Sequence, residues 1–176
     1  PIVYVSAVPR ADALLALLRS GRLYVHRWFP FKPGLHACPF TFEPSAAPFA
    51  HLADFSPAAR AQSGDALSGA PPIAVSGDGR WLLSGGHADC TLRCTSLARS
   101  DVVVRARQHA GVITCVDVGA DGVTVVTGAA DTTVVVWALY GTRGRLAAAT
   151  AAPRPLHVLC GHCGAVRCVA ISSELD

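Results

Sequence analysis

The feature that most constrains the fold of this 176-residue chain is a unit that recurs after about 43 residues. The Asp-Gly pair at Asp78-Gly79 recurs at Asp121-Gly122, and each pair stands between two apolar runs. Asp89, which follows the first pair, recurs as Asp131 at nearly the same interval. Repetition at this length is typical of arrays in which a small unit packs against copies of itself. The sequence therefore indicates several copies of one unit.

The clearest copy runs from His109 to Trp137. Between Val112 and Trp137 lie three short β-branched runs, separated by Gly, Asp and Ala. This spacing favours a meander of antiparallel strands and leaves no room for a helix of ordinary length. A lone sheet of this kind has two uncovered faces and unpaired edges, so it needs neighbours of its own type. We therefore expect an all-β fold built from small sheets.

The order and spacing of four residues in this copy resemble a WD40 β-propeller repeat. A His opens the unit, an Asp follows the second strand, and a Trp closes the third strand, with the intervals from His to Asp and from Asp to Trp that WD repeats keep. In WD40 repeats the His, a Ser or Thr of the second strand, the Asp and the Trp form one buried hydrogen-bonded chain. The resemblance implies such a structural chain for His109, Thr127, Asp131 and Trp137.

A catalytic set of the Ser/His/Asp type is the alternative for the same residues. A nucleophile must be exposed at a pocket and lie next to its base. These residues fall on strand and turn positions that a propeller buries in order to satisfy its own polar groups. We therefore expect no catalytic residue here, and no cofactor or metal site.

Residues 73–106 repeat the unit imperfectly. Ser84 corresponds to Thr127, but Thr95 stands at the Trp position, and no His precedes Asp89 at the distance at which His109 precedes Asp131. The buried polar chain is therefore not expected to form fully in this copy. Val102 to Arg105 is the expected outer strand.

The first 43 residues are expected to form another degenerate copy. Strands are predicted at Ile2–Val5, Arg22–Trp28 and Phe40–Glu43. Ala11–Leu18 lacks alternation and, taken alone, could equally be a short helix. The strand ending at Trp28, which follows a Gly turn, favours a strand there too.

The chain thus divides into three blades, a linking loop and the start of a fourth blade. The expected parts are a first blade at 1–43, a Pro/Ala/Ser/Gly-rich loop at 44–70, a second blade at 71–106, a third blade at 107–159 with a loop insertion at 140–155, and the start of the next blade at 160–176. In the last part, Gly161-His162 restarts the repeat and Val166 to Ile171 is a new first strand. We expect a partial WD40 β-propeller of about three four-stranded blades plus one strand, in an open arc.

An open arc leaves apolar end faces that further blades would cover. The sequence has no Met and begins with a strand-like segment, so we expect it to be internal to a longer chain. Expressed alone, it should be poorly soluble or unfold without cooperativity. A monodisperse monomer with one sharp thermal transition would contradict this expectation.

The sequence that flanks the repeats narrows the family. HRWFP, PFTFE, DTTVVVW and TAAPR followed by a Gly-His pair occur in that order along the chain. Together they resemble the C-terminal WD40 region of BEACH-domain proteins of the neurobeachin type, and the resemblance covers almost the whole chain. It implies a cytoplasmic scaffold in vesicle trafficking or membrane protein sorting, peripheral at membranes through the parent protein.

The composition allows a core and argues against two classes of function. With 51% hydrophobic and 15% charged residues the chain can form a core, yet no run approaches the roughly 18 apolar residues of a spanning helix. The 15 Lys and Arg are scattered, which argues against a nucleic-acid interface. The expected partners are proteins that bind the propeller rim loops, together with the preceding BEACH module and the remaining blades of the parent chain.

Cys160-Gly161-His162-Cys163 carries the alternative function, because CGHC is the motif of protein disulfide isomerases. Thiol-redox chemistry needs a low-pKa cysteine at the start of a helix, whereas the residues that follow alternate like a strand. A zinc site completed by Cys168 is a second form of this alternative. Seven cysteines at irregular spacing favour buried reduced thiols, Cys115 and Cys168 among them. A thiol titration distinguishes this alternative from the scaffold function, since only a reactive cysteine pair labels rapidly near neutral pH.

Overall fold

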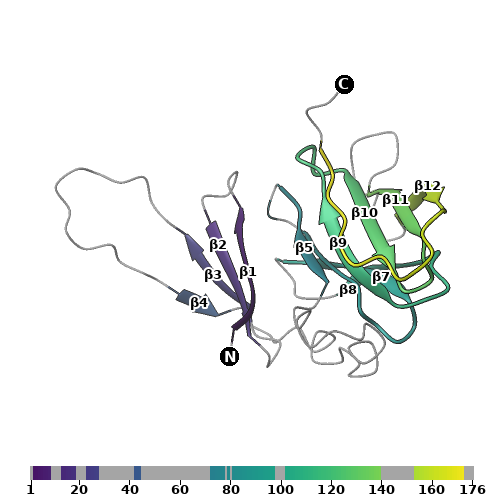
Figure 1. Ribbon diagram of the computed structural model, residues 1–176. Coiled ribbons are helices and arrows are strands. Elements are labelled where there is room, and N and C mark those ends of the chain that lie inside the picture. Colours follow the sequence, from purple (N-terminus) through teal and green to yellow (C-terminus); the bar gives the residue numbers. More distant parts are fainter. Residues whose placement is uncertain are drawn as a thin grey trace.

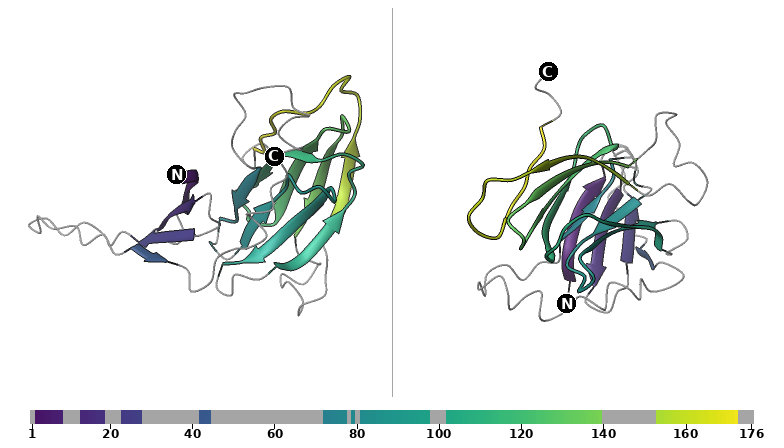
Figure 2. Two further views of the ribbon diagram at one scale, coloured as in Figure 1. Left: turned by 90° about the horizontal axis from the view of Figure 1, so that it is seen from below. Right: turned by 90° about the vertical axis from the view of Figure 1, so that its right-hand side faces the viewer.

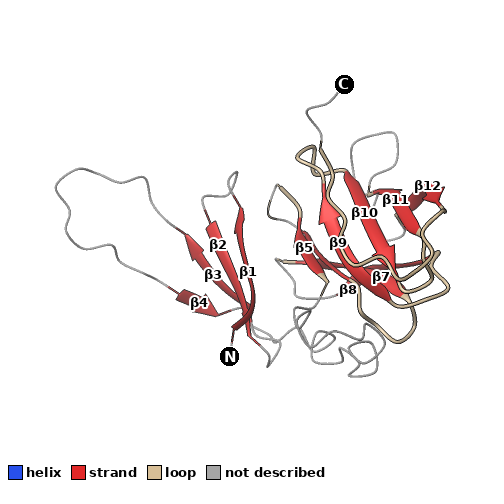
Figure 3. Cartoon of the chain, in the orientation of Figure 1, coloured by secondary structure: helices blue, strands red, loops and turns tan. Residues whose placement is uncertain are grey.

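The computed structural model describes the residues that form the three sheets and their shorter connections. These are residues 2–8, 13–18, 23–27, 42–44, 72–77, 79, 81–97, 102–139 and 153–172. All regular structure within these ranges is β-strand (Figure 3), and they contain no helix that could cross a membrane. The linking loop after Pro44 and the insertion up to residue 152 lie outside the described residues.

The strands form three four-stranded antiparallel sheets, and in each sheet the strand order follows the chain. The first sheet contains β1 (Ile2–Val8), β2 (Ala13–Leu18), β3 (Leu23–Arg27) and β4 (Phe42–Pro44). The second contains β5 (Ile73–Val75), β6 (Trp81–Ser84), β7 (Thr91–Ser96) and β8 (Val102–Arg107). The third contains β9 (Ile113–Val118), β10 (Thr124–Ala129), β11 (Val134–Ala138) and β12 (Arg154–Leu159).

The first strands of the sheets lie next to one another in sequence order. β1 contacts β5, and β5 contacts β9 (Figure 1). Figure 2 shows the second and third sheets packed face to face, with the first sheet beyond the second. This is the arrangement of consecutive propeller blades around an axis, with no closure into a barrel. The predicted all-β partial propeller is confirmed, and Ala13–Leu18 is a strand.

The main core lies between the second and third sheets. It contains apolar side chains from both sheets that are less than a tenth exposed: Leu83, Leu92, Cys94, Val104, Ala106, Ile113, Val125, Ala129, Val135, Trp137 and Leu139. Complete burial of a side chain such as Leu92 or Val135 stabilises the folded state by about 1.5–3 kcal/mol. Alternate residues of β10 and β11 point into this core, because successive side chains of a strand point to opposite faces of the sheet. The alternation of apolar residues in these strands therefore determines which face of the third sheet packs against the second sheet.

Two glycines allow the next repeat to approach closely. A Cβ atom on Gly85 would lie 2.5 Å from Cγ2 of Ile113, and one on Gly128 would lie 2.5 Å from Cγ1 of Val166. The two glycines occupy equivalent positions of the repeat, each directly after the Ser or Thr of the second strand, and Ile113 begins β9. Val166 therefore takes the place on the third sheet that Ile113 takes on the second.

The segment 160–172 differs from the sequence expectation, because the predicted strand Val166–Ile171 is not formed. The backbone N–H of Val166 donates to Ala129 O (3.1 Å), and the N–H of Ile171 donates to the Asp117 carboxylate (2.8 Å). These bonds hold the segment along the face of the third sheet. A strand also requires a partner strand in its own sheet, and none of the described strands pairs with this segment. In addition, β12 begins at Arg154, inside the stretch expected to be an insertion.

Gly128→Ala should detach this segment, because the added methyl group would overlap Val166 and the Cys115 sulfur, 2.7 Å away. We expect faster hydrogen exchange at the Val166 amide, measured by mass spectrometry. Gly164→Ala is the matched control, since no atom lies within 4 Å of its Cβ position. Equal exchange in the two variants would contradict the proposed close packing.

Candidate functional site

A buried hydrogen-bonded chain crosses the third sheet from its core to one end. Trp137 Nε1 donates to Thr127 Oγ1 (2.8 Å), and Thr127 Oγ1 lies 2.7 Å from His109 Nε2. The His109 and Trp137 rings are tilted by 58° with centroids 6.4 Å apart. His109, Thr127 and Trp137 are 2%, 0% and 1% exposed, so the chain is inaccessible to solvent.

Asp131 lies at the end of this chain and connects two loops. His109 Nδ1 is 3.3 Å from one carboxylate oxygen of Asp131, and that oxygen also accepts the N–H groups of Ala110 (2.7 Å) and Gly111 (3.2 Å). The other oxygen accepts the N–H (3.0 Å) and the hydroxyl (2.7 Å) of Thr133. The carboxylate thus joins the β8–β9 loop to the β10–β11 turn. The structure brings together all four residues that the spacing singled out.

Burial and hydrogen bonding set the charges in this network. Burial lowers the pKa of His109 below 6.5 and outweighs the opposing effect of Asp131. Partial burial acts to raise the pKa of Asp131, but the bonds from Thr133, Ala110 and Gly111 together bring it down to about 2. Asp131 is therefore an anion beside a neutral imidazole near neutral pH.

A neutral His109 with its proton on Nδ1 satisfies every group in the chain. Nδ1–H donates toward Thr133 Oγ1 (3.0 Å) and the Asp131 carboxylate, while Nε2 accepts the hydroxyl proton of Thr127. The Thr127 oxygen in turn accepts Trp137 Nε1–H. The Thr127 hydroxyl is fully buried, so a substrate cannot reach it. The arrangement therefore stabilises the sheet and has no access for nucleophilic catalysis.

The second sheet contains a shorter version of this network. Ser84 Oγ lies 3.0 Å from His87 Nε2, and His87 is only 1% exposed. Asp89 accepts the N–H (3.2 Å) and hydroxyl (2.7 Å) of Thr91, as Asp131 does from Thr133. In both turns the residue after the Asp has a positive φ, 58° for Cys90 and 71° for Thr132. The turn is therefore repeated even though the full chain is not.

Sequence reasoning missed His87. The repeat spacing places the His well upstream of Asp89, as His109 lies upstream of Asp131, whereas the structure takes one from the β6–β7 turn just before Asp89. Thr95, at the Trp position, is completely buried. One feature of the sequence could have indicated His87: a His follows shortly after Ser84, in a turn that also contains Asp89.

The predicted cysteine site does not have the geometry of a redox or zinc centre. Cys160, Cys163 and Cys168 are all exposed, so the expectation that Cys168 is buried is wrong. The reason is that the segment 160–172 turns only Val166, Val169 and Ile171 toward the third sheet. No helix follows Cys160 within the described segment, and the described residues contain no group of three or more metal-ligating side chains.

The other cysteines of the described residues, Cys90, Cys94 and Cys115, lie in or beside the sheets. Burial raises the pKa of Cys94 to about 12 and also raises that of the half-buried Cys115. Neither thiol is therefore ionised near neutral pH. Gly161 and His162, the predicted repeat start, are exposed, and their role as the start of a further blade stays a prediction.

A groove of about 490 Å³ lies between the third sheet and the segment 160–172. Apolar side chains of β10, β11 and β12 form one wall, and the segment forms the other; the lining includes Val126, Val134, Val136, Leu159, His162, Val166, Arg167 and Cys168. It is the remaining open part of the face on which Val166 is packed.

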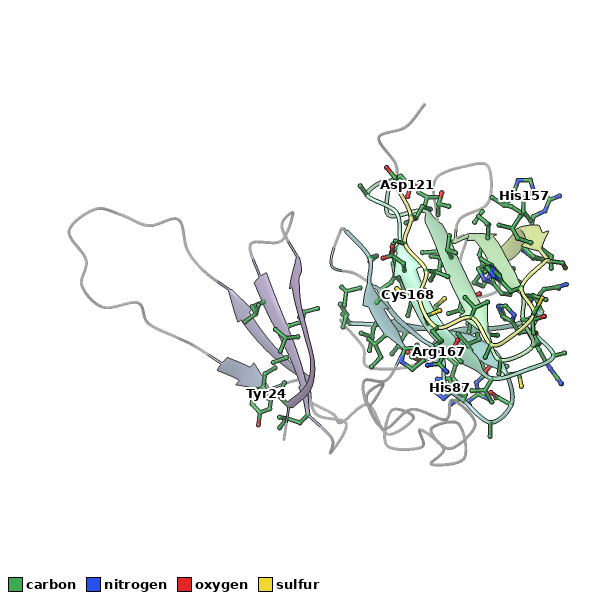
Figure 4. The ribbon with its side chains drawn as sticks, viewed as in Figure 1. Tyr24, His87, Asp121, His157, Arg167 and Cys168 are labelled. Atoms are coloured by element: carbon green, nitrogen blue, oxygen red, sulfur yellow. The ribbon has the colours of Figure 1, made fainter. Side chains whose placement is uncertain are left out.

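Three connections meet at one end of the second and third sheets, and we call residues 87–90, 108–111 and 130–133 the His-side rim. Cys90 Sγ lies 3.8 Å from Ala110 O, and Ala110 N–H donates to Asp131. Figure 4 shows His87 at this end of the strands and Asp121 at the opposite end. The exposed residues of the rim include Ala88, Asp89, Gln108 and Ala110.

Comparison with known proteins places these features in a family. The model of the neurobeachin β-propeller domain matches residues 72–176. BEACH domain-containing protein B of Arabidopsis thaliana is 34% identical over 108 residues, which cover 54% of this chain and 4% of that protein. BEACH domain-containing protein lvsE of Dictyostelium discoideum is 25% identical over 178 residues, which cover 100% of this chain and 8% of that protein. The chain thus spans only a small part of these curated relatives.

Asp131→Ala should destabilise the protein by about 1–3 kcal/mol, because the partners of the carboxylate lose a charged acceptor at a mostly buried position. Denaturant unfolding followed by tryptophan fluorescence measures the loss. Asp121→Ala is the control, since the Asp121 carboxylate makes similar turn bonds to Val123 and Thr124 where water can replace it. A loss no greater than that of the control would contradict the linking role of Asp131.

Stability should also fall on acidification in two stages. Because the pKa of folded His109 lies below 6.5, the unfolded chain takes up a proton first and stability is lost as the pH falls below about 6.5. The lowered pKa of Asp131 adds a second loss as the pH falls from 3.8 toward 2. Melting temperatures measured against pH should show a weaker first stage in His109→Asn. An unchanged first stage would exclude His109 as its source.

Proposed function

Because this chain belongs to the neurobeachin β-propeller family, we propose that it is a non-enzymatic part of a BEACH-type protein that binds other proteins through its rim. Rigid sheets that present loops from several blades are a common basis for protein recognition. The finer part of the proposal, a role in vesicle trafficking or membrane protein sorting in the cytoplasm, rests on the sequence resemblance.

The observation that carries the proposal is the set of contacts that hold the loops of the His-side rim together. The Asp131 carboxylate holds the backbone of the β8–β9 loop, and the Ala110 carbonyl of that loop contacts Cys90 in the β6–β7 turn. Loops from two blades are therefore fixed relative to each other before any partner binds. Such preorganisation lowers the entropy cost of binding.

A scaffold role also agrees with the chemistry of the site. Internal hydrogen bonds already occupy the polar groups of His109, Thr127 and Asp131. Burial of His109 and Thr127 also shields them from a substrate. The exposed rim side chains are small or polar, as at Ala88, Asp89 and Gln108. Their chemistry suits reversible contacts with another protein surface rather than a covalent step.

A photo-crosslinking amino acid placed at Ala88 in the full chain tests the rim. We expect it to capture partner proteins in cells, because Ala88 is exposed on the His-side rim. The matched control is the same substitution at Ala120, an exposed alanine beside Asp121 at the opposite end of the strands (Figure 4). Capture from position 120 but not from position 88 would assign binding to the other end.

Rim variants that lose a partner but leave receptor sorting unchanged would contradict the trafficking role.

A further inference from the structure

The outer edge of the third sheet is apolar and open. β12 is the last strand in the order of this sheet and pairs only with β11, so its other side has no strand partner among the described residues. All six residues of β12 are exposed. Leu156, Val158 and Leu159 are 47%, 46% and 52% exposed, and they account for three of the five large apolar side chains exposed in the described part of the chain.

The equivalent edge of the second sheet is different. On β8, Val104 and Ala106 are buried at 7% and 6%, and the residues exposed between them and after them are Arg105 and Arg107. Charged side chains on an edge strand oppose pairing with another strand. The same protection is missing from the second half of β12.

Protection on β12 is confined to its beginning. Arg154 is charged, Pro155 has no N–H to donate, and the register shifts between Val136 and Trp137 of β11, opposite this part of β12. Leu156 lies at this register shift and has no partner on β11, and the run His157–Leu159 that follows is regular up to its pairing with Val134. Alternate residues of this run direct their backbone N–H and C=O groups away from β11, where they can pair with a short extended segment.

Apolar side chains line both faces of this open edge. Val158 pairs with Val135, which lies in the core shared with the second sheet, and Leu159 pairs with Val134 on the opposite face. A strand added beside β12 would place successive side chains next to Val158 and Leu159 in turn. The edge therefore fits a segment that is largely apolar or β-branched on both faces.

The charge near the edge limits which extended segments can bind there. The stretch from 132 to 173 contains no Asp or Glu, while Arg154 and His157 are exposed on β12 itself. Figure 4 shows His157 at the far end of the molecule, away from the first sheet. Two copies of β12 would bring together strands without an acidic group, so a partner that supplies a carboxylate near Arg154 is electrostatically better matched.

We propose that β12 binds an extended segment of a partner protein, apolar or β-branched at successive positions and acidic near Arg154, as a fifth strand of the third sheet. This site goes beyond the rim, because it uses backbone hydrogen bonding along the outer edge rather than loop side chains. Neighbouring sheets pack through their faces, as the core between the second and third sheets shows, so packing of a further sheet does not itself require this edge.

The experiment uses the full chain and three fluorescent synthetic peptides. The first alternates valine and threonine over eight residues before an aspartate, so that antiparallel pairing with β12 places the carboxylate near Arg154. The second replaces the aspartate with lysine, and the third replaces the central valine with proline. Fluorescence anisotropy should show binding of the aspartate peptide in preference to the other two. Val158→Lys should weaken this binding about fivefold, through loss of an apolar cross-strand pair. Val5→Lys is the control, because Val5 is similarly exposed (52%) on a strand of the first sheet.

Two further measurements keep the result independent of any folding defect in Val158→Lys. Arg154→Glu should reverse the preference between the aspartate and lysine peptides, and hydrogen exchange at residues 156–159 should slow when the aspartate peptide is added to the unmodified protein. Equal binding of the proline peptide would overturn the proposal. Self-association that Val158→Lys abolishes, without peptide binding, would overturn it in favour of a second copy as the occupant.

Discussion

Burial of the His109 imidazole is favourable only because both of its ring nitrogens have partners. An unpaired polar nitrogen in this position would cost as much as several apolar contacts contribute. Thr127 from β10 and Asp131 from the following turn remove this cost, and Thr127 also satisfies the indole N–H of Trp137 on β11. One imidazole therefore fixes the positions of a loop, a strand, a turn and a further strand, and the apolar core beside Trp137 depends on that alignment.

The second sheet pairs the hydroxyl of its second strand with a different histidine. Ser84 of β6 occupies the position that Thr127 occupies in β10, and the partner of the Ser84 hydroxyl is His87 in the adjoining turn. The network is local, spanning three residues instead of eighteen, so it ties the turn to its own strand but not to the loop that enters the sheet. The Asp-centred turn is retained in both sheets. Turn geometry is thus the more constant part of the repeat.

Much of this architecture follows from the sequence. Alternating β-branched runs and Asp-Gly turns predict the strands of the third sheet. The resemblance of the segment from His109 to Trp137 to a WD40 repeat implies four residues that do meet in space. Periodicity could not reveal His87, because it says nothing about which loop reaches a buried hydroxyl. It also predicted a strand at Val166–Ile171, since a pattern records side-chain alternation but not whether a partner strand is present to pair with it. The exposure of Cys168 follows from that same absence of pairing.

The close approach at Gly85 and Gly128 has a consequence for how such a chain can change over evolutionary time. Each glycine lies against a β-branched side chain that belongs to the following repeat, Ile113 in one case and Val166 in the other. A larger residue at either glycine is compatible with the fold only if the side chain opposite becomes smaller. Substitutions at residues so far apart in the chain should therefore covary, and divergence of one repeat is restricted by the sequence of the next.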